Sequence, residues 1–170
     1  MGRLERWFRP DRHFDKVSSV DLDALRADGI HGLILDLDNT LVPWRSAEIP
    51  PDIAEWAHKA TGLGFQICIA SNTRRYGRLG KVAEALGATY VMNVSKPRRG
   101  GFRRAALQMG LELPQVAVIG DQLLTDILAA KRLGVHAILV DRLANREFLI
   151  TKFNRLVENL IARALARTGS

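Results

Sequence analysis

The sequence predicts one α/β domain of three layers, residues 1–170, in which helices cover both faces of a parallel sheet of about five strands. Short apolar runs alternate with longer segments of helical pattern, and such alternation is typical of right-handed βαβ units. The runs are apolar throughout, as expected for strands buried on both faces. We expect a core at about 30–140, an N-terminal arm at 1–17 and a C-terminal helix at about 146–167. A chain of 170 residues, 47% of them hydrophobic, can bury such a core.

The central strand is expected within 33–41, which reads LILDLDNTL. Asp36 and Asp38 follow the apolar run, and the carboxyl ends of strands in a parallel sheet open on a crevice where ligands bind. Two carboxylates one residue apart concentrate negative charge, which a hard cation such as Mg²⁺ would offset. An Asx turn at Asp38-Asn39 explains the same residues without any ligand.

The remaining elements are bounded by glycine, proline and asparagine residues, which end helices and form turns. Further strands are expected at 65–70, 89–94, 116–119 and 135–140. Helices are expected at 18–28, 52–61, 73–86, 100–109 and 123–133.

The two ends of the chain combine basic and apolar residues. Residues 1–17 interleave Trp7, Phe8 and Phe14 with arginines and lysines. This pattern suits a membrane interface, a nucleic-acid surface or an arm whose aromatic side chains pack on the domain. Residues 146–167 have one apolar and one basic helical face. Such a helix lies at a membrane interface, or packs on its own domain or on a partner subunit.

Composition limits the compartment and the partners. The net charge of +7 favours an anionic partner, which includes a phosphorylated substrate, nucleic acid and an acidic membrane surface. A single cysteine, Cys68, excludes an intrachain disulfide and indicates a reducing compartment. No apolar run reaches the roughly 18 residues of a membrane span. We therefore expect a cytoplasmic protein, either soluble or peripheral at the inner face of the membrane.

Polar residues follow four successive predicted strands, and these strand ends meet at one edge of a parallel sheet. Taken singly, the residues suit a turn, a helix cap, a solvated lysine or acids in a first helical turn. Taken together and in this order, they resemble the four signature motifs of the haloacid dehalogenase-like (HAD) phosphohydrolase superfamily. The residues are Asp36 and Asp38, Ser71 and Asn72, Lys96, and Asp121 with Asp126.

The resemblance implies a Rossmann-like HAD fold and a role for each acid. Asp36 would be the nucleophile that forms an aspartyl-phosphate, and Asp38 the general acid and then the general base. Mg²⁺ would be held by Asp36, the backbone carbonyl of Asp38 and Asp121, with Asp126 as a further ligand or as support for the others.

The same resemblance implies a phosphate site. Ser71 would donate a hydrogen bond to the phosphoryl oxygens, and backbone N–H groups near Asn39 and Asn72 would join it. Lys96 would offset the negative charge of the nucleophile and of the phosphoryl group.

The intervals between the motifs hold only one helix and one strand each, which leaves no room for a cap domain. The chain thus resembles the capless class III HAD phosphatases, whose site would be open to large or surface-bound substrates unless an oligomer covers it. The segments LILDLDNTLVPW, GDQLLTD and TKFNRLVE resemble the YqeG-like group of class IIIA.

Eukaryotic relatives of the YqeG-like group include phosphatidylglycerophosphate phosphatases. The resemblance thus implies Mg²⁺-dependent hydrolysis of a lipid phosphate such as phosphatidylglycerophosphate. A nucleic-acid 3′-phosphatase, a soluble sugar phosphatase and a non-catalytic anion-binding HAD scaffold remain the alternatives.

Overall fold

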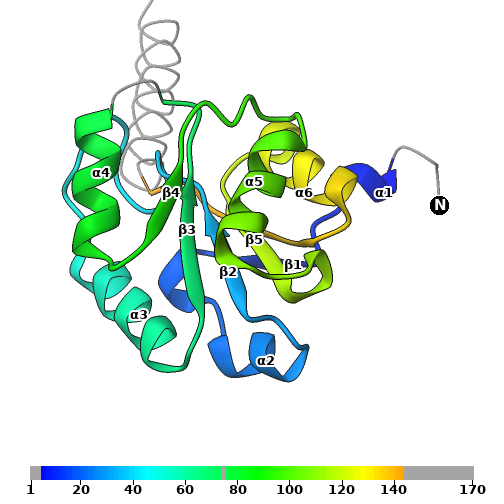
Figure 1. Cartoon of the computed structure of the whole chain (residues 1–170), viewed down its shortest axis with the longest axis horizontal. Coiled ribbons are helices and arrows are strands. Elements are labelled where there is room, and N and C mark those ends of the chain that lie inside the picture. Colours follow the sequence, from blue (N-terminus) through cyan, green and yellow to red (C-terminus); the bar gives the residue numbers. More distant parts are fainter. Residues whose placement is uncertain (1–4, 74–75, 144–170) are drawn as a thin grey trace, which may run out of the picture.

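A computed structural model describes residues 5–73 and 76–143 and contains a six-stranded parallel sheet in the order β1-β6-β5-β2-β3-β4 (Figure 1). Its strands are β1 (Arg12–Phe14), β2 (Gly32–Leu35), β3 (Gln66–Ala70), β4 (Thr89–Val91), β5 (Val116–Gly120) and β6 (His136–Val140). Every residue of the central strands β2 and β5 is buried, as their continuous apolar sequences predict. The predicted parallel α/β sheet is confirmed.

Helices cover both faces of this sheet, so the predicted three layers are also confirmed. Figure 1 shows α3 (Pro51–Gly62) and α4 (Tyr76–Ala85) on one side and α5 (Gly100–Met109) and α6 (Leu128–Leu133) on the other. Two buried clusters fill the spaces between helices and sheet. The shorter elements are α1 (Glu5–Phe8), η1 (Val17–Ser19), α2 (Leu22–Ala27), η2 (Leu113–Gln115) and a π-helical turn, η3 (Leu123–Ile127).

The sixth strand, β1, comes from the segment that the sequence assigns to an N-terminal arm. It pairs with β6 at the edge of the sheet, where Arg12 faces Ile138. Asp11 fixes the start of this pairing, because its N–H donates to the carbonyl of Ala137 (2.7 Å) and its Oδ2 accepts from the N–H of Ala137 (2.8 Å). Three residues without an apolar run are too weak a pattern to predict a strand.

Between Asp36 and Lys96 the described chain consists of α3, β3, α4, β4 and their connecting loops, so no cap domain lies there. The helix predicted at 146–167 lies outside the described residues. In the part of the chain that the structure describes, no helix combines the length and apolar character needed to cross a membrane.

Candidate active site

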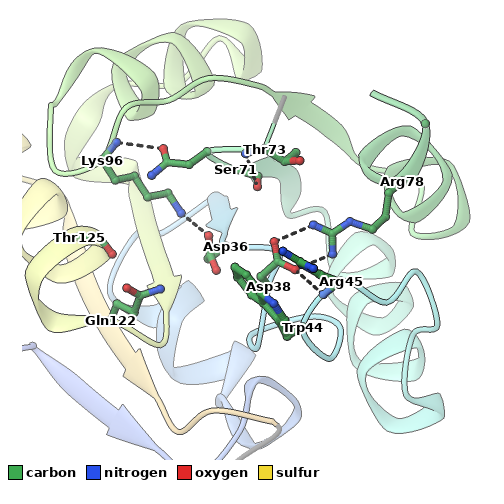
Figure 2. A pocket seen from close by; sticks show the side chains of 12 residues that line it. Asp36, Asp38, Trp44, Arg45, Ser71, Thr73, Arg78, Lys96, Gln122 and Thr125 are labelled. Carbon is green, nitrogen blue, oxygen red and sulfur yellow. Dashed lines mark hydrogen bonds and ion pairs between the residues drawn. The ribbon is translucent and has the colours of Figure 1, made fainter. Parts of the chain in front are cut away.

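The predicted motif residues meet at the carboxyl edge of the sheet. Asp36, Ser71 and Asp121 directly follow β2, β3 and β5, and Lys96 lies in the loop after β4. A pocket of about 740 Å³ opens there (Figure 2). Residues that line it are Asp36, Asp38, Trp44, Arg45, Ser71, Asn72, Thr73, Gly77, Arg78, Lys96, Gln122 and Thr125.

Asp36 is fixed at the floor of this pocket. Its backbone N–H donates to the carbonyl of Ile119 (3.0 Å), and its residue surface is only 9% exposed. Burial raises the pKa of Asp36 to about 7; the charges of Asp126 and Asp121 act in the same direction, while Lys96 opposes them. The ammonium of Lys96 contacts Asp36 Oδ1 directly (Figure 2).

Lys96 links two of the acids from a buried position. Its side chain is only 3% exposed, and its Nζ lies 2.7 Å from Asp126 Oδ1 as well as against Asp36. Burial by itself lowers the pKa of this amine, but the charges of Asp36 and Asp126 outweigh burial and raise it, so the side chain is a cation. The backbone N–H of Lys96 donates to Asn72 Oδ1 (3.1 Å), which holds the loop against the end of β3.

Asp36, Asp121 and Asp126 form a group that we call the acid cluster. One carboxylate oxygen from each lies within 4.8 Å of the others. Burial, and then the charge of Asp126, raise the pKa of Asp121. Thr40 donates to Asp121 Oδ1 (3.4 Å), and Arg142 Nε lies 2.9 Å from Asp121 Oδ2.

The acid cluster depends on a glycine at the end of β5. A Cβ atom at Gly120 would lie 2.5 Å from Cγ and 2.6 Å from Cβ of Asp126. The turn η3 brings Asp126 over this glycine, and Asp126 Oδ2 accepts from the N–H of Gln122 (3.3 Å). The close approach of Asp126 to the sheet therefore requires glycine at position 120.

The acid cluster suits a hard divalent cation. Three carboxylates offer oxygen ligands, which Mg²⁺ prefers, and their mutual repulsion is one cause of the raised pKa values of Asp36 and Asp121. A cation would relieve that repulsion.

Asp38 stands apart from the acid cluster, in the opposite part of the pocket. Arg78 on α4 donates two hydrogen bonds to the Asp38 carboxylate, from Nη1 to Oδ1 at 2.5 Å and from Nη2 to Oδ2 at 2.7 Å (Figure 2). The backbone N–H of Arg45 donates to Asp38 Oδ1 as well (3.1 Å). Burial raises the pKa of Asp38, but the hydrogen bonds from Arg78 and Arg45 outweigh it, so the net shift is downward.

Sequence reasoning did not predict that Arg78, Arg142 or Thr40 contacts the acids. Arg78 belongs to a basic group in the sequence, but nothing there distinguishes a residue that binds Asp38 from a solvated arginine. Arg142 carries no sequence signal at all. Only the fold brings these side chains to the acids that they contact.

The predicted phosphate-binding residues divide into two groups. Ser71 and Asn72 line the pocket, with Ser71 Oγ accepting from the N–H of Thr73 (3.1 Å). Asn39 is not among the lining residues, and its N–H donates to the carbonyl of Val42 (2.7 Å). The backbone N–H of Asn39 is thus used within its own loop rather than presented to the pocket.

Known proteins resemble this chain in sequence and fold. A HAD-hydrolase-like family model matches residues 93–153. The probable phosphatase YqeG of Bacillus subtilis is 37% identical over 98% of this chain and 96% of its own length. A chloroplastic phosphatidylglycerophosphate phosphatase 1 of Chlamydomonas reinhardtii is 30% identical over 86% of this chain but only 58% of its own length.

The fold also has a solved counterpart. A crystal structure of an uncharacterized protein from Listeria monocytogenes serotype 4b superimposes with a TM-score of 0.56 at 18% identity, covering 74% of this chain and 99% of that one. That likeness concerns the fold alone. Because the match to the Bacillus subtilis relative extends over nearly the whole of both sequences, this chain belongs to the YqeG-like family of HAD phosphatases.

Proposed function

We propose that this phosphatase is a Mg²⁺-dependent phosphomonoester hydrolase that works through an aspartyl-phosphate on Asp36, with a lipid phosphate such as phosphatidylglycerophosphate as its substrate. The observation that carries the proposal is the buried Asp36 carboxylate. Asp36 contacts the Lys96 cation and is itself a member of the acid cluster. An acid placed in this way can act as a nucleophile.

In the first step a carboxylate oxygen of Asp36 attacks phosphorus, and the bond from phosphorus to the leaving oxygen breaks. The leaving oxygen keeps the electron pair of that bond and takes a proton from Asp38. Asp38 must therefore be protonated when this step begins. Lys96 offsets the negative charge on the phosphoryl group, and Ser71 Oγ donates a hydrogen bond to it.

In the second step Asp38 acts as the base. It removes a proton from water, the water oxygen attacks phosphorus, and the phosphorus–oxygen bond to Asp36 breaks to release phosphate. The downward pKa shift from Arg78 and Arg45 keeps Asp38 ionised, which is the form that this step requires. Mg²⁺ would be held by Asp36, Asp121 and the backbone carbonyl of Asp38, with Asp126 as support. When bound, the ion would supply Lewis-acid stabilisation of the phosphoryl oxygens.

The lipid substrate is supported by three observations. The Chlamydomonas relative is named as a phosphatidylglycerophosphate phosphatase. The net charge of +7 favours an anionic surface. No cap domain lies between Asp36 and Lys96 in the described chain, so a headgroup can reach the pocket without leaving its bilayer.

The nucleophile is tested by Asp36→Asn, with Asp23→Asn on the exposed side of α2 as the control. Asp36→Asn should abolish turnover of a small phosphomonoester and reduce the stabilisation of the fold by Mg²⁺, because an amide neither attacks phosphorus nor holds the ion comparably. Asp23→Asn should retain both properties. Wild-type turnover by Asp36→Asn would remove this residue from the mechanism.

The substrate is tested by phosphate release at matched concentrations of phosphatidylglycerophosphate in anionic vesicles, a 3′-phosphorylated oligonucleotide and a sugar phosphate. The lipid should be hydrolysed fastest, and higher salt should weaken binding to the vesicles. Removal of residues 146–170 should weaken that binding further. Preference for the oligonucleotide would refute the lipid substrate and leave the phosphatase chemistry standing.

A further inference from the structure

Exposed apolar side chains occur in the segments that line the pocket. In the described part of the chain, five large hydrophobic residues are markedly exposed: Trp44 (60%), Tyr76 (62%), Leu107 (72%), Leu123 (41%) and Leu124 (68%). Trp44 lines the pocket, and Leu123 and Leu124 lie between the lining residues Gln122 and Thr125. Tyr76 directly precedes the lining residue Gly77, whereas Leu107 lies on α5, which contributes no lining residue.

Trp44, Leu123 and Leu124 form what we call the apolar rim. We leave Tyr76 out of it, because its ring packs edge-on against Tyr90 at 5.9 Å. Figure 2 shows Trp44 on one side of Asp36 and Gln122 and Thr125 on the other. The rim therefore reaches the pocket from two separate segments, one after β2 and one after β5.

Basic residues accompany this rim. Arg45 lines the pocket, and its guanidinium lies 5.9 Å from the centroid of the Trp44 ring. Arg98 is exposed two residues after Lys96, and Glu48 is the only acid between Trp44 and the start of α3. An amphipathic tryptophan next to arginine suits the headgroup layer of a membrane, where the ring meets acyl chains and the cation meets lipid phosphates.

We propose that the apolar rim, together with Arg45, is the surface through which this protein contacts an anionic lipid bilayer. The inference rests on the proposed lipid substrate and adds to it the face that meets the membrane. A phosphomonoester on a membrane lipid lies in the headgroup layer, so the pocket mouth has to reach that layer. Apolar side chains on two sides of the mouth would enter the interface together and place the pocket over the headgroup.

A bilayer fits this surface better than a protein partner does. Stable protein interfaces bury about 800 Å² and 20–30 residues on each side. Three apolar side chains supply much less, whereas membrane binding needs only a few inserted side chains together with electrostatic attraction.

The test measures binding to vesicles of equal parts phosphatidylglycerol and phosphatidylcholine by flotation, in the absence of any substrate lipid. Leu124→Ser and Trp44→Ser should each lower the affinity about tenfold, because each removes apolar area from the interface. Leu107→Ser is the matched control, since Leu107 is about as exposed as Leu124 but lies on α5, which contributes no lining residue, and it should bind like the wild type. Leu124→Ser and Leu107→Ser should both hydrolyse p-nitrophenyl phosphate in solution at the wild-type rate, which verifies their folding.

A second measurement tests directly whether Trp44 enters the bilayer. Brominated lipids in the same vesicles should quench the emission of Trp44, measured as the difference between the wild type and Trp44→Phe. Wild-type affinity in Leu124→Ser, or an equal loss in Leu107→Ser, would overturn the proposed surface. A change of oligomeric state in Leu124→Ser without a change in vesicle binding would overturn it as well and identify the rim as a protein interface. Wild-type enzyme that binds vesicles through the rim but does not hydrolyse phosphatidylglycerophosphate would instead refute the proposed substrate.

Discussion

Gly120→Ala should destabilise the protein and move Asp126 out of the acid cluster. The added Cβ would lie 2.5–2.6 Å from three atoms of the Asp126 side chain, about 1 Å inside normal contact. Asp126 is only 1% exposed, and its oxygens contact Lys96 and the N–H of Gln122, so it has little room to retreat. Forcing one carbon into a packed interior costs about 1–3 kcal/mol. A loss of about 2 kcal/mol corresponds to a fall in Tm of about 4–8 °C for a chain of this size.

The assay is thermal unfolding with and without Mg²⁺, together with the rate of phosphomonoester hydrolysis. If the acid cluster holds Mg²⁺, the ion at 100 times its Kd should stabilise the wild type by about 2.7 kcal/mol. Gly120→Ala should gain less, because one of the three carboxylates is displaced. Gly62→Ala is the control: this exposed glycine ends α3, and no atom lies within 4 Å of the place that its Cβ would take, so alanine should fit and stabilise by about 0.4–1 kcal/mol.

The reasoning would be refuted if Gly120→Ala had the melting temperature of the wild type and responded equally to Mg²⁺. Equal stability with a weaker Mg²⁺ response would locate the effect in the acid cluster alone. A lower stability with an unchanged Mg²⁺ response would show that Asp126 takes no part in holding the ion.

Two further predictions concern ion pairs that the structure places. Arg78→Met should lower the free energy of unfolding by about 2 kcal/mol, because Asp38 loses two charge-assisted hydrogen bonds in a largely buried setting. It should also raise the Asp38 pKa, so that the protonated Asp38 needed in the first step persists to higher pH and the alkaline limb of the pH profile of kcat/KM moves to higher pH. Asp11→Asn should destabilise by about 1 kcal/mol, measured by urea unfolding, because the contact with Lys131 loses its charge. Burial raises the Asp11 pKa, but Lys131 and the N–H of Ala137 lower it overall. The carboxylate therefore contributes stability above its unfolded pKa near 3.8, and the difference between wild type and variant should vanish as the pH falls through the lower folded value.

The central part of the fold follows from continuous apolar runs. Strands expected at 65–70, 89–94, 116–119 and 135–140 correspond to β3, β4, β5 and β6. A parallel strand that is buried on both faces, such as β5, needs apolar residues throughout, whereas the edge strand β4 is only partly buried and ends at Val91. The central strand β2 ends with the apolar run itself, directly before Asp36. It ends at Leu35 because the chain turns back, with the N–H groups of Leu41 and Val42 both donating to Leu37 and with Asn39 in a left-handed conformation (φ 63°).

The sequence predicts those residues of the candidate site that follow the ends of strands. Asp36, Ser71, Lys96 and Asp121 meet because parallel strands present their carboxyl ends at one edge. The partner of Asp38 was not predictable, because an arginine on a distant helix has the same local pattern whether it binds an acid or faces solvent. The same holds for β1, whose position depends on the backbone of Ala137 rather than on its own residues.

The contacts at the pocket join residues that lie far apart along the chain. Lys96 contacts Asp36 across 60 positions, Arg78 contacts Asp38 across 40, and Thr40 contacts Asp121 across 81. Contacts between distant positions form only after the intervening segments have been ordered, so they require nearly the whole sheet. Partial unfolding can leave α3 or α5 helical while it separates these pairs. Enzymatic activity should thus disappear at lower denaturant concentrations than the helical circular dichroism signal, and refolded protein should regain its helices before it regains turnover.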